Sequence, residues 1–292
     1  MDELAIILIR GMGIGAIYAL IAMSFNIVHN ASGVLNFAQG NILVVGGLFA
    51  ATALAANHGQ WAWLAMLAVA AIVLGLAVGV QGFITLLPLR SSVEQHSWLV
   101  STLAAAVIIN AIILVAVGSE PLNVRGPFAS VPLLGTRTPM PYVLSTVLAL
   151  GWWAALHWFH RATRIGIAMR AIAQDLDAAR AAGLRVRRLQ LYAFAISGAI
   201  TGSIGYSAAP IISMANDSGI GYSMNGFVAA VIGGLGSNAG ALVGGLGIGV
   251  ISMYAALEFG GEFQSVISLA VLIAVLMLRP EGLFGHAAGR RV

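Results

Sequence analysis

The sequence contains neither cysteine nor lysine, and few of its 292 residues carry a charge. Without cysteine the chain can form no disulfide, thiolate nucleophile or cysteine-ligated cluster. Without lysine it can form no Schiff base and no P-loop, because the P-loop lysine reaches the nucleotide phosphates. We therefore expect any ATP used with this protein to be hydrolysed by another chain.

Charged side chains make up only 8% of the sequence, whereas 60% of the residues are hydrophobic. A typical soluble domain is ~25% charged and ~45–50% apolar. So few charges cannot cover the water-facing surface of a globule of this size. The composition argues against a soluble enzyme, a nucleic-acid-binding protein and a disordered chain, and it indicates an integral membrane protein.

Long apolar runs divide the chain into candidate membrane-spanning helices, each of which needs roughly 20 residues. Full-length candidates cover residues 4–27, 34–56, 61–87, 98–117, 142–159, 191–212, 239–257 and 263–278. A run over 227–235 would make a helix only about 13 Å long, so we expect a half-helix or re-entrant segment there. The sequence predicts one all-α polytopic membrane domain over residues 1–292, with about eight spans and one short broken helix.

The arginines indicate the orientation of the chain. Seven of them, opposed by two aspartates, give residues 161–188 a net charge of +5. Because positive loops stay inside, we expect a cytoplasmic loop over 161–189, a cytoplasmic segment over 90–96 and a cytoplasmic tail over 279–292. The N-terminus and the loop over 119–141 are then outside. The first run follows Asp2 and Glu3 rather than basic residues, so we expect a span and not a cleavable signal peptide.

Glycine is abundant, with 36 residues that often recur four apart within the spans. That spacing lets helix backbones approach closely, and we expect it to mark helix packing at Gly11/Gly15, Gly75/Gly79, Gly198/Gly202 and Gly245/Gly249. A second group, Gly233, Gly234 and Gly236, lies where the short run meets the next span. A regular helix does not tolerate so many glycines, and in transporters broken helices often mark the substrate path.

Polar side chains gather at the start of the second run. An isolated polar residue in a span is most simply a group that hydrogen-bonds another helix, but a cluster is also consistent with a substrate path. His157 and His160 lie among tryptophans at a helix end, which favours an interfacial aromatic belt over a metal site. We find no catalytic or metal-ligating constellation. The expected path residues are Asn36, Phe37, Gln39, Gly40, Asn41, Asn225, Gly233, Gly234 and Gly236.

An apolar stripe typical of a helix runs along the cytoplasmic loop at steps of four and three residues, through Ile165, Met169, Ile172, Leu176 and Ala179. Arg170, Asp177 and Arg180 fall on another face, where Asp177 and Arg180 are close enough to pair. Gly183 is a natural residue to end the helix. The stripe is consistent with a helix on the membrane surface or in a protein groove. The mixture of acids and arginines favours the protein groove.

Four blocks of the sequence resemble branched-chain amino acid ABC transporter permeases, and more so the shorter, LivH-like type. The blocks are Gly33-Val34-Leu35-Asn36-Phe37-Ala38-Gln39-Gly40, Arg170-Ala171-Ile172-Ala173-Gln174-Asp175, Ala229-Ala230-Val231-Ile232-Gly233-Gly234-Leu235-Gly236-Ser237 and Arg279-Pro280-Glu281-Gly282-Leu283-Phe284-Gly285. Their order from residue 33 to 285 extends the resemblance over nearly the whole chain. The sequence departs from the family at Asn238 and Ala239, where a proline is usual.

The resemblance implies a non-enzymatic permease subunit of an importer in the bacterial inner membrane. Its partners would be a second, related permease in a heterodimer, two cytoplasmic ATPases that bind ATP and Mg, a periplasmic binding protein and membrane lipid. Neither a cofactor in this chain nor a nucleic acid is expected. Together with the stripe, the resemblance implies which residues couple this chain to the ATPases. They are Ile165, Met169, Arg170, Ile172, Asp175, Leu176, Asp177, Ala179, Arg180 and Gly183.

The substrate stays open at this point, because members of that family also carry urea, short amides and small organic acids. A rival class is an ion-coupled secondary transporter or a channel, which would need acidic residues within its spans. Glu258 and Glu262 are the late candidates, and both lie at a predicted external end. A membrane-embedded enzyme would need catalytic residues that we do not find.

Overall fold

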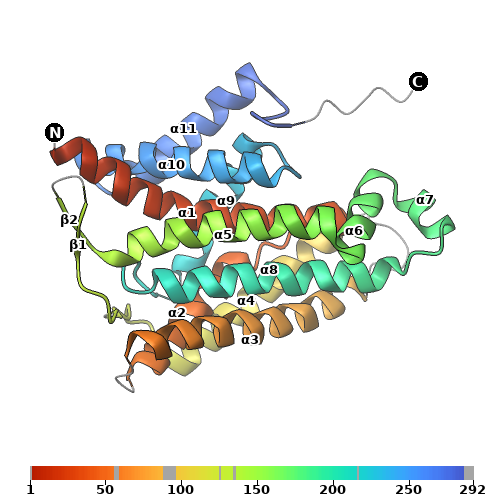
Figure 1. The fold of residues 1–292 in the computed structure, drawn as a ribbon, viewed down its shortest axis with the longest axis horizontal. Helices are drawn as coiled ribbons and strands as arrows, with labels where there is room; N and C mark the ends of the chain where they lie inside the picture. Colours follow the sequence, from red (N-terminus) through yellow and green to blue (C-terminus); the bar gives the residue numbers. More distant parts are fainter. Residues whose placement is uncertain are drawn as a thin grey trace.

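The computed structural model describes residues 2–55, 59–87, 97–124, 126–133, 136–215 and 217–285. These residues form a bundle of helices with one short hairpin (Figure 1). The helices are α1 (Asp2–Ser32), α2 (Gln39–Ala55), α3 (Gln60–Leu86), α4 (Ser97–Val117), α5 (Met140–Ala162), α6 (Arg164–Gln174), α7 (Leu176–Ala181), α8 (Val186–Ala208), α9 (Ser218–Gly233), α10 (Asn238–Glu258) and α11 (Phe263–Leu278). The antiparallel strands β1 (Val131–Leu133) and β2 (Thr136–Thr138) were not predicted.

Five of the described helices, α1, α3, α4, α5 and α10, are long and apolar enough to cross a membrane. The apolar helices α2 and α11 are shorter, with 17 and 16 residues. A polytopic helical membrane protein is therefore the correct class, while the number of eight spans stays a prediction.

The two ends of the bundle carry different elements (Figure 1). The N-terminus and the hairpin β1–β2 lie at one end, whereas α6 and α7, within the arginine-rich stretch, lie at the other. The predicted orientation places the hairpin end outside and the α6–α7 end in the cytoplasm. The predicted cytoplasmic segment 90–96 and the tail beyond residue 285 lie outside the described residues.

Helix α1 is the buried centre of the fold, because it packs against α5, α8, α9 and α10. From residue 16 to residue 28 no side chain of α1 is more than 4% exposed. Glycines allow this burial. A Cβ on Gly15 would overlap the backbone of Gly245, and a Cβ on Gly249 would overlap Gly15. Gly198 on α8 lies equally close to the backbone of α3. The predicted packing role of the spaced glycines is confirmed at these contacts.

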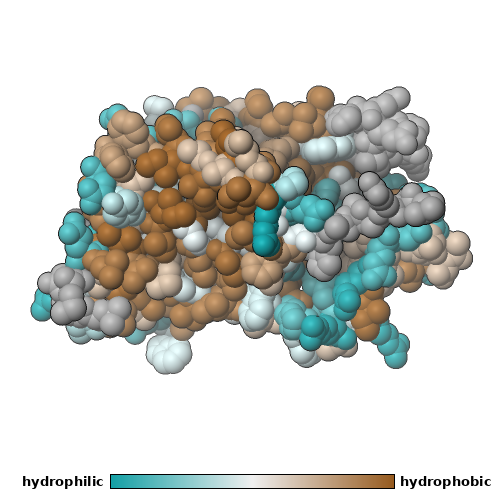
Figure 2. Space-filling view, turned by 90° about the horizontal axis from the view of Figure 1, so that it is seen from above, coloured by the Kyte–Doolittle hydropathy of each residue, from teal (hydrophilic) through white to brown (hydrophobic). Residues whose placement is uncertain are grey.

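The outer helices present apolar side chains to their surroundings. Leu76 on α3, Val107 on α4 and Val147 on α5 are each more than half exposed. Figure 2 shows the side of the bundle nearest α10 and α11, where apolar residues dominate the middle and hydrophilic residues gather toward the ends. Exposed apolar surface of this extent suits hydrocarbon rather than water.

Helix α2 begins at Gln39, five residues later than predicted. Gly33, with a φ of +69°, ends α1. The side chain of Asn36 then accepts a hydrogen bond from the backbone N–H of Ala38 at 3.2 Å, which holds a turn before α2 starts. The polar group at residues 36–41 therefore spans this turn and the first turn of α2 instead of lying within a continuous helix.

Two further helices differ from the prediction. α9 begins at Ser218 rather than residue 227, so it has 16 residues and is about 24 Å long. The cytoplasmic helix is divided at Asp175, because the side chain of Asp175 accepts hydrogen bonds from the backbone N–H groups of Asp177 and Ala178, both at 2.9 Å. Asp175 thereby starts α7 as its N-cap.

Candidate translocation path and coupling segment

The N-terminal parts of the two short helices α2 and α9 meet. The hydroxyl of Ser223 on α9 accepts a hydrogen bond from the backbone N–H of Gly40 at 2.8 Å and donates one to the carbonyl of Phe37 at 3.1 Å. A Cβ on Gly40 would overlap the carbonyl of Gly219, and one on Gly219 would overlap Asn41. Glycine at both positions therefore allows this close contact, which we call the α2–α9 junction.

Asn36 and Gln81 join the junction to α3. The Asn36 Nδ2 donates to Gln81 Oε1 at 3.1 Å, and the Gln81 Nε2 donates back to Asn36 Oδ1 at 3.0 Å. Asn36 is fully buried. Both amides are neutral, so this reciprocal pair satisfies two polar side chains without placing a charge in the interior.

Gln39 joins the junction to α8 and α1. Its Nε2 donates to Ser197 Oγ at 3.0 Å, while its Oε1 accepts from Thr201 Oγ1 at 2.7 Å. Thr201 in turn lies 2.8 Å from the hydroxyl of Ser24 on α1. All four side chains are buried and hydrogen-bonded. Gln39 thus links three helices.

The remaining predicted path residues lie in different surroundings. Phe37 packs against Phe25 and Phe227, with ring centroids 5.8 and 5.9 Å away, so α1, the turn before α2 and α9 share an aromatic contact that the sequence did not reveal. Asn41 is buried and donates to the carbonyl of Ala106 on α4. Asn225 lies half-buried within α9, and among the described residues its side chain donates to the carbonyl of Gly221 in the same helix.

Gly233, Gly234 and Gly236 lie away from the junction, at the far end of α9. Asn26 accepts a hydrogen bond from the backbone N–H of Gly236 at 2.9 Å and donates to the carbonyl of Ser237 at 3.0 Å. Asn30 donates to the carbonyl of Gly236 at 2.9 Å. Because Gly234 and Gly236 have φ values of +95° and +90°, glycine suits both positions.

The C-terminal segment packs on the same turn. The backbone N–H of Phe284 donates to the carbonyl of Gly233 at 3.0 Å, and that of Leu283 donates to Ile232 at 2.8 Å. A Cβ on Gly234 would overlap Gly285. Two blocks that look separate in the sequence therefore form one structural unit with the end of α1.

The apolar stripe of the cytoplasmic segment faces the protein's own helices. Met169, Ile172 and Ala179 are at most 5% exposed, and α6 packs against α1, α5 and α8. These side chains are therefore not a free surface for a partner, which corrects our interpretation of the stripe. Leu176 is partly buried, whereas Ile165 is 42% exposed.

The polar residues of this segment lie on its surface. Arg170, Asp175, Asp177, Arg180 and Gly183 are all exposed. Arg180 pairs with Asp177 at 3.2 Å, as predicted, although so exposed a pair stabilises the fold little. Gly183 has a φ of +80° and follows the last residue of the helical turn, as expected of a terminating glycine.

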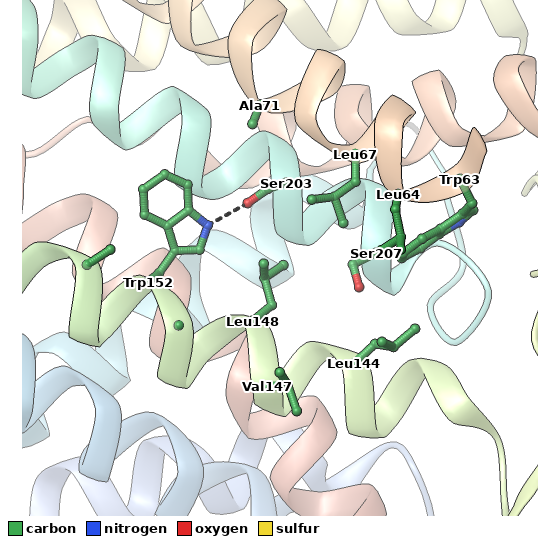
Figure 3. A pocket seen from close by; sticks show the side chains of 12 residues that line it. Trp63, Leu64, Leu67, Ala71, Leu144, Val147, Leu148, Trp152, Ser203 and Ser207 are labelled. Atoms are coloured by element: carbon green, nitrogen blue, oxygen red, sulfur yellow. Dashed lines mark hydrogen bonds between the residues drawn. The ribbon is translucent and has the colours of Figure 1, made fainter. Parts of the chain in front are cut away.

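A cleft of about 480 Å³ separates α3 from α5, and α8 forms its floor (Figure 3). Its lining is mostly apolar, from Leu64 and Leu67 on one side and Leu148 on the other. Trp152 reaches across to donate its indole N–H to Ser203 Oγ at 2.9 Å. Such a lining suits an apolar group. The sequence showed only scattered tryptophans here, and no periodic signal linked these helices.

Comparisons with known proteins agree over almost the whole chain. Residues 7–276 match the family described as "Branched-chain amino acid transport system / permease component". The high-affinity branched-chain amino acid transport system permease protein LivH of Escherichia coli K12 is 29% identical, over 97% of this chain and 96% of the relative. The corresponding BraD protein of Pseudomonas aeruginosa is 29% identical, over 98% and 97%. The solved structure of PsaBC from Streptococcus pneumoniae shares the fold, with a TM-score of 0.53 and 10% identity over 94% of this chain and 92% of that one.

Proposed function

Because this chain belongs to the family of permease components of branched-chain amino acid transport systems, we propose that it forms the path by which an ATP-binding-cassette importer carries branched-chain amino acids. Its relatives in that family are transport subunits rather than enzymes.

The assembly that we propose has five parts. A second, related permease pairs with this chain as a heterodimer, and two cytoplasmic ATPases bind ATP and Mg. A periplasmic binding protein delivers the substrate, and the complex lies in the bacterial inner membrane. The lack of lysine supports the division of labour, because this chain cannot build a P-loop. The polar helices α6 and α7 at one end support a cytoplasmic face there.

We propose eight spans, α1, α2, α3, α4, α5, α8, α10 and α11, with α9 as the short broken element. Both α9 and α11 have 16 residues, or about 24 Å at ~1.5 Å per residue. They differ in composition, because α11 is a continuous apolar helix, whereas α9 opens with Ser218, Gly219 and Gly221. The N-terminal half of α9 takes part in the α2–α9 junction, and the helix ends at the turn that holds the C-terminal segment.

The observation that carries the proposed path is the α2–α9 junction, where the N-terminal parts of two helices meet beside neutral, hydrogen-bonded amides. In transporters, broken helices of this kind lie at the substrate path. We propose that Asn36, Phe37 and Gln39 line it from one side and α9 from the other. In the conformation described here Asn36 and Gln39 are buried, so transport would require α2 and α9 to separate.

Reconstitution tests the function. The permease, its partner, both ATPases and the binding protein are assembled in proteoliposomes, and uptake of labelled leucine is followed with and without ATP. We expect uptake of leucine to require both ATP and the binding protein. Unlabelled isoleucine and valine should compete with leucine and reduce its uptake. Omitting the binding protein is the control. Uptake of urea or a short amide in place of leucine would contradict the substrate, and uptake driven by an ion gradient without ATP would contradict the class.

Coupling to the ATPases is proposed for the exposed face of α6 and α7. Ile165 is 42% and Ile167 is 53% exposed, whereas Met169 is 3% exposed. We expect Ile165→Glu or Ile167→Glu to leave the fold intact and to abolish co-purification of the ATPase. Met169→Glu would instead unfold α6, because it buries a carboxylate without a partner. A complex of the Ile165→Glu and Ile167→Glu variants that still hydrolyses ATP in response to substrate would refute the docking surface.

A further inference from the structure

A small, positively charged hollow lies at the α6 end of the bundle, away from the α2–α9 junction. It has a volume of about 210 Å³ and is formed by the last turns of α5, by α6 and by the start of α10. His157, His160 and Arg161 come from α5, and Arg170 comes from α6. We call it the α5–α6–α10 hollow.

The charges of this hollow are not balanced within the described chain. None of the described residues that line it is an acid. The described residues contain one salt bridge, which joins Arg180 to Asp177 and leaves Arg161 and Arg170 out. Two guanidinium groups that share a concave surface without a carboxylate repel each other, so an anion between them would relieve that repulsion.

The start of α10 adds two hydrogen-bond donors. The backbone N–H of Gly240 is capped by Ser237 Oγ at 3.1 Å, and that of Ala241 donates to the carbonyl of Ser237. The N–H groups of Asn238 and Ala239, which line the hollow, have no partner within the helix because they lie in its first turn. Free amides at the positive end of a 21-residue helix suit a phosphate group.

The surface next to the hollow has the character of a lipid site. Leu150, Ala154, His157 and Arg161 follow one another at steps of four, three and four residues, so one exposed face of α5 changes from apolar to cationic along its length. Trp153 lines the hollow, and the neighbouring Trp158 is 65% exposed. Tryptophan gathers where hydrocarbon meets headgroups.

We propose that the α5–α6–α10 hollow binds the phosphate of an anionic phospholipid from the cytoplasmic leaflet. One acyl chain follows the apolar face of α5 past Ala154 and Leu150, while Arg161 and Arg170 hold the phosphate over the first turn of α10. A free phosphate or an acidic protein segment would satisfy the charges but would make no use of the apolar face. The proposal rests on the orientation proposed above, which puts α6 in the cytoplasm.

Phosphatidylglycerol is the probe, and native mass spectrometry of the permease–ATPase complex in detergent is the measurement. We expect saturable binding of phosphatidylglycerol and much weaker binding of phosphatidylcholine, which carries no net charge. The double variant Arg161→Gln/Arg170→Gln should lose roughly thirtyfold in affinity, as expected for two arginines at an anionic surface. The matched control is Arg188→Gln, an exposed arginine on α8 outside the hollow, and it should bind as the parent does.

Three results would overturn the proposal. The first is equal binding of phosphatidylglycerol by the double variant and the parent. The second is displacement of the lipid by an equal concentration of inorganic phosphate, which would indicate a site for free anions. The third is lipid binding by the permease alone that assembly with the ATPase abolishes, which would indicate an acidic segment of the ATPase. Lipid binding does not require transport. A failed leucine uptake assay would therefore contradict the proposed function without contradicting the lipid site. Thermal unfolding checks that the double variant is folded.

Discussion

The reciprocal pair of Asn36 and Gln81 gives the sharpest test of how the α2–α9 junction is held. Replacing Asn36 by Leu removes three hydrogen bonds: one that Asn36 donates to Gln81, one that it accepts from Gln81 and one that it accepts from the backbone N–H of Ala38. Gln81 has no other side-chain hydrogen bond among those described, so its amide would be left unpaired. A hydrogen bond between membrane helices contributes ~0.6 kcal/mol, and an unsatisfied buried group costs ~1–3 kcal/mol. Three lost bonds at ~0.6 kcal/mol each and one unpaired amide at ~1–3 kcal/mol give a loss of about 3–5 kcal/mol for Asn36→Leu.

The partner change, Gln81→Leu, removes two of these bonds. The side-chain carbonyl of Asn36 keeps its bond from Ala38, but the buried Nδ2 of Asn36 loses the acceptor on Gln81. In the double variant neither amide remains to be satisfied. We therefore expect its loss of stability to fall short of the sum of the single losses by ~1 kcal/mol or more, within the range found for contacting residues. Gln39→Met is the comparison, with an expected loss of about 1 kcal/mol. It costs little because Ser197 and Thr201 keep backbone carbonyl partners.

The assay is reversible unfolding of the purified chain in mixed micelles, followed by circular dichroism. Uptake of labelled leucine by the reconstituted importer is measured on the same variants. Additive losses within ~0.5 kcal/mol would refute the reciprocal pair. So would an Asn36→Leu loss no larger than that of Gln39→Met. Recovered stability without recovered uptake in the double variant would point to a role of these amides in transport.

Gly249→Ala should prevent folding, because its Cβ would overlap Gly15, whereas Gly247→Ala on the same helix meets nothing within 4 Å and should be tolerated; the yield of folded protein checks both. Because Gln39 is fully buried, a cysteine at position 39 should react with a water-soluble maleimide only when nucleotide changes the α2–α9 junction. Asn225 is half-buried, so a cysteine at position 225 should react in every nucleotide state. Inaccessibility of both in all states would remove them from the path. Without its binding protein, the permease–ATPase complex should bind labelled leucine with a dissociation constant above the micromolar range, because neutral amides cannot replace the water around a zwitterion. A micromolar dissociation constant, with competition by isoleucine and valine, would overturn this prediction.

The features that could be predicted depend on residues close together in the sequence. Asp177 and Arg180 pair because they lie three apart on one helical face. Gly183 ends its helix because it adopts a positive φ. The spans are visible as apolar runs because each membrane helix forms its backbone hydrogen bonds within one continuous segment of the sequence. The spacing of Gly245 and Gly249 also indicates a close contact, although only the structure identifies α1 as the neighbour.

The start of α9 could not be predicted, because the signal lies in another part of the chain. Residues 218–226 combine glycines with Ser223 and Asn225, a composition that looks like a loop. They are helical in the fold because Gly219 lies against Asn41 and Gly226 lies against Ile21. The division of the cytoplasmic helix was missed for a different reason. The apolar stripe continues through Asp175, whereas the capping hydrogen bonds of its side chain interrupt the helix.

The end of α1 is where these long-range contacts converge. Asn26 and Asn30 bind the turn between α9 and α10, which also receives the C-terminal segment. Residues 29–33 line a second polar hollow opposite residues 172–178, and the buried side chains of α6 pack against the bundle. If an ATPase moves α6 and α7, as proposed above, these helices must repack against α1, which anchors one end of α9. The other part of α9 meets α2 at Gly40, so α9 lies between the proposed coupling segment and the proposed path.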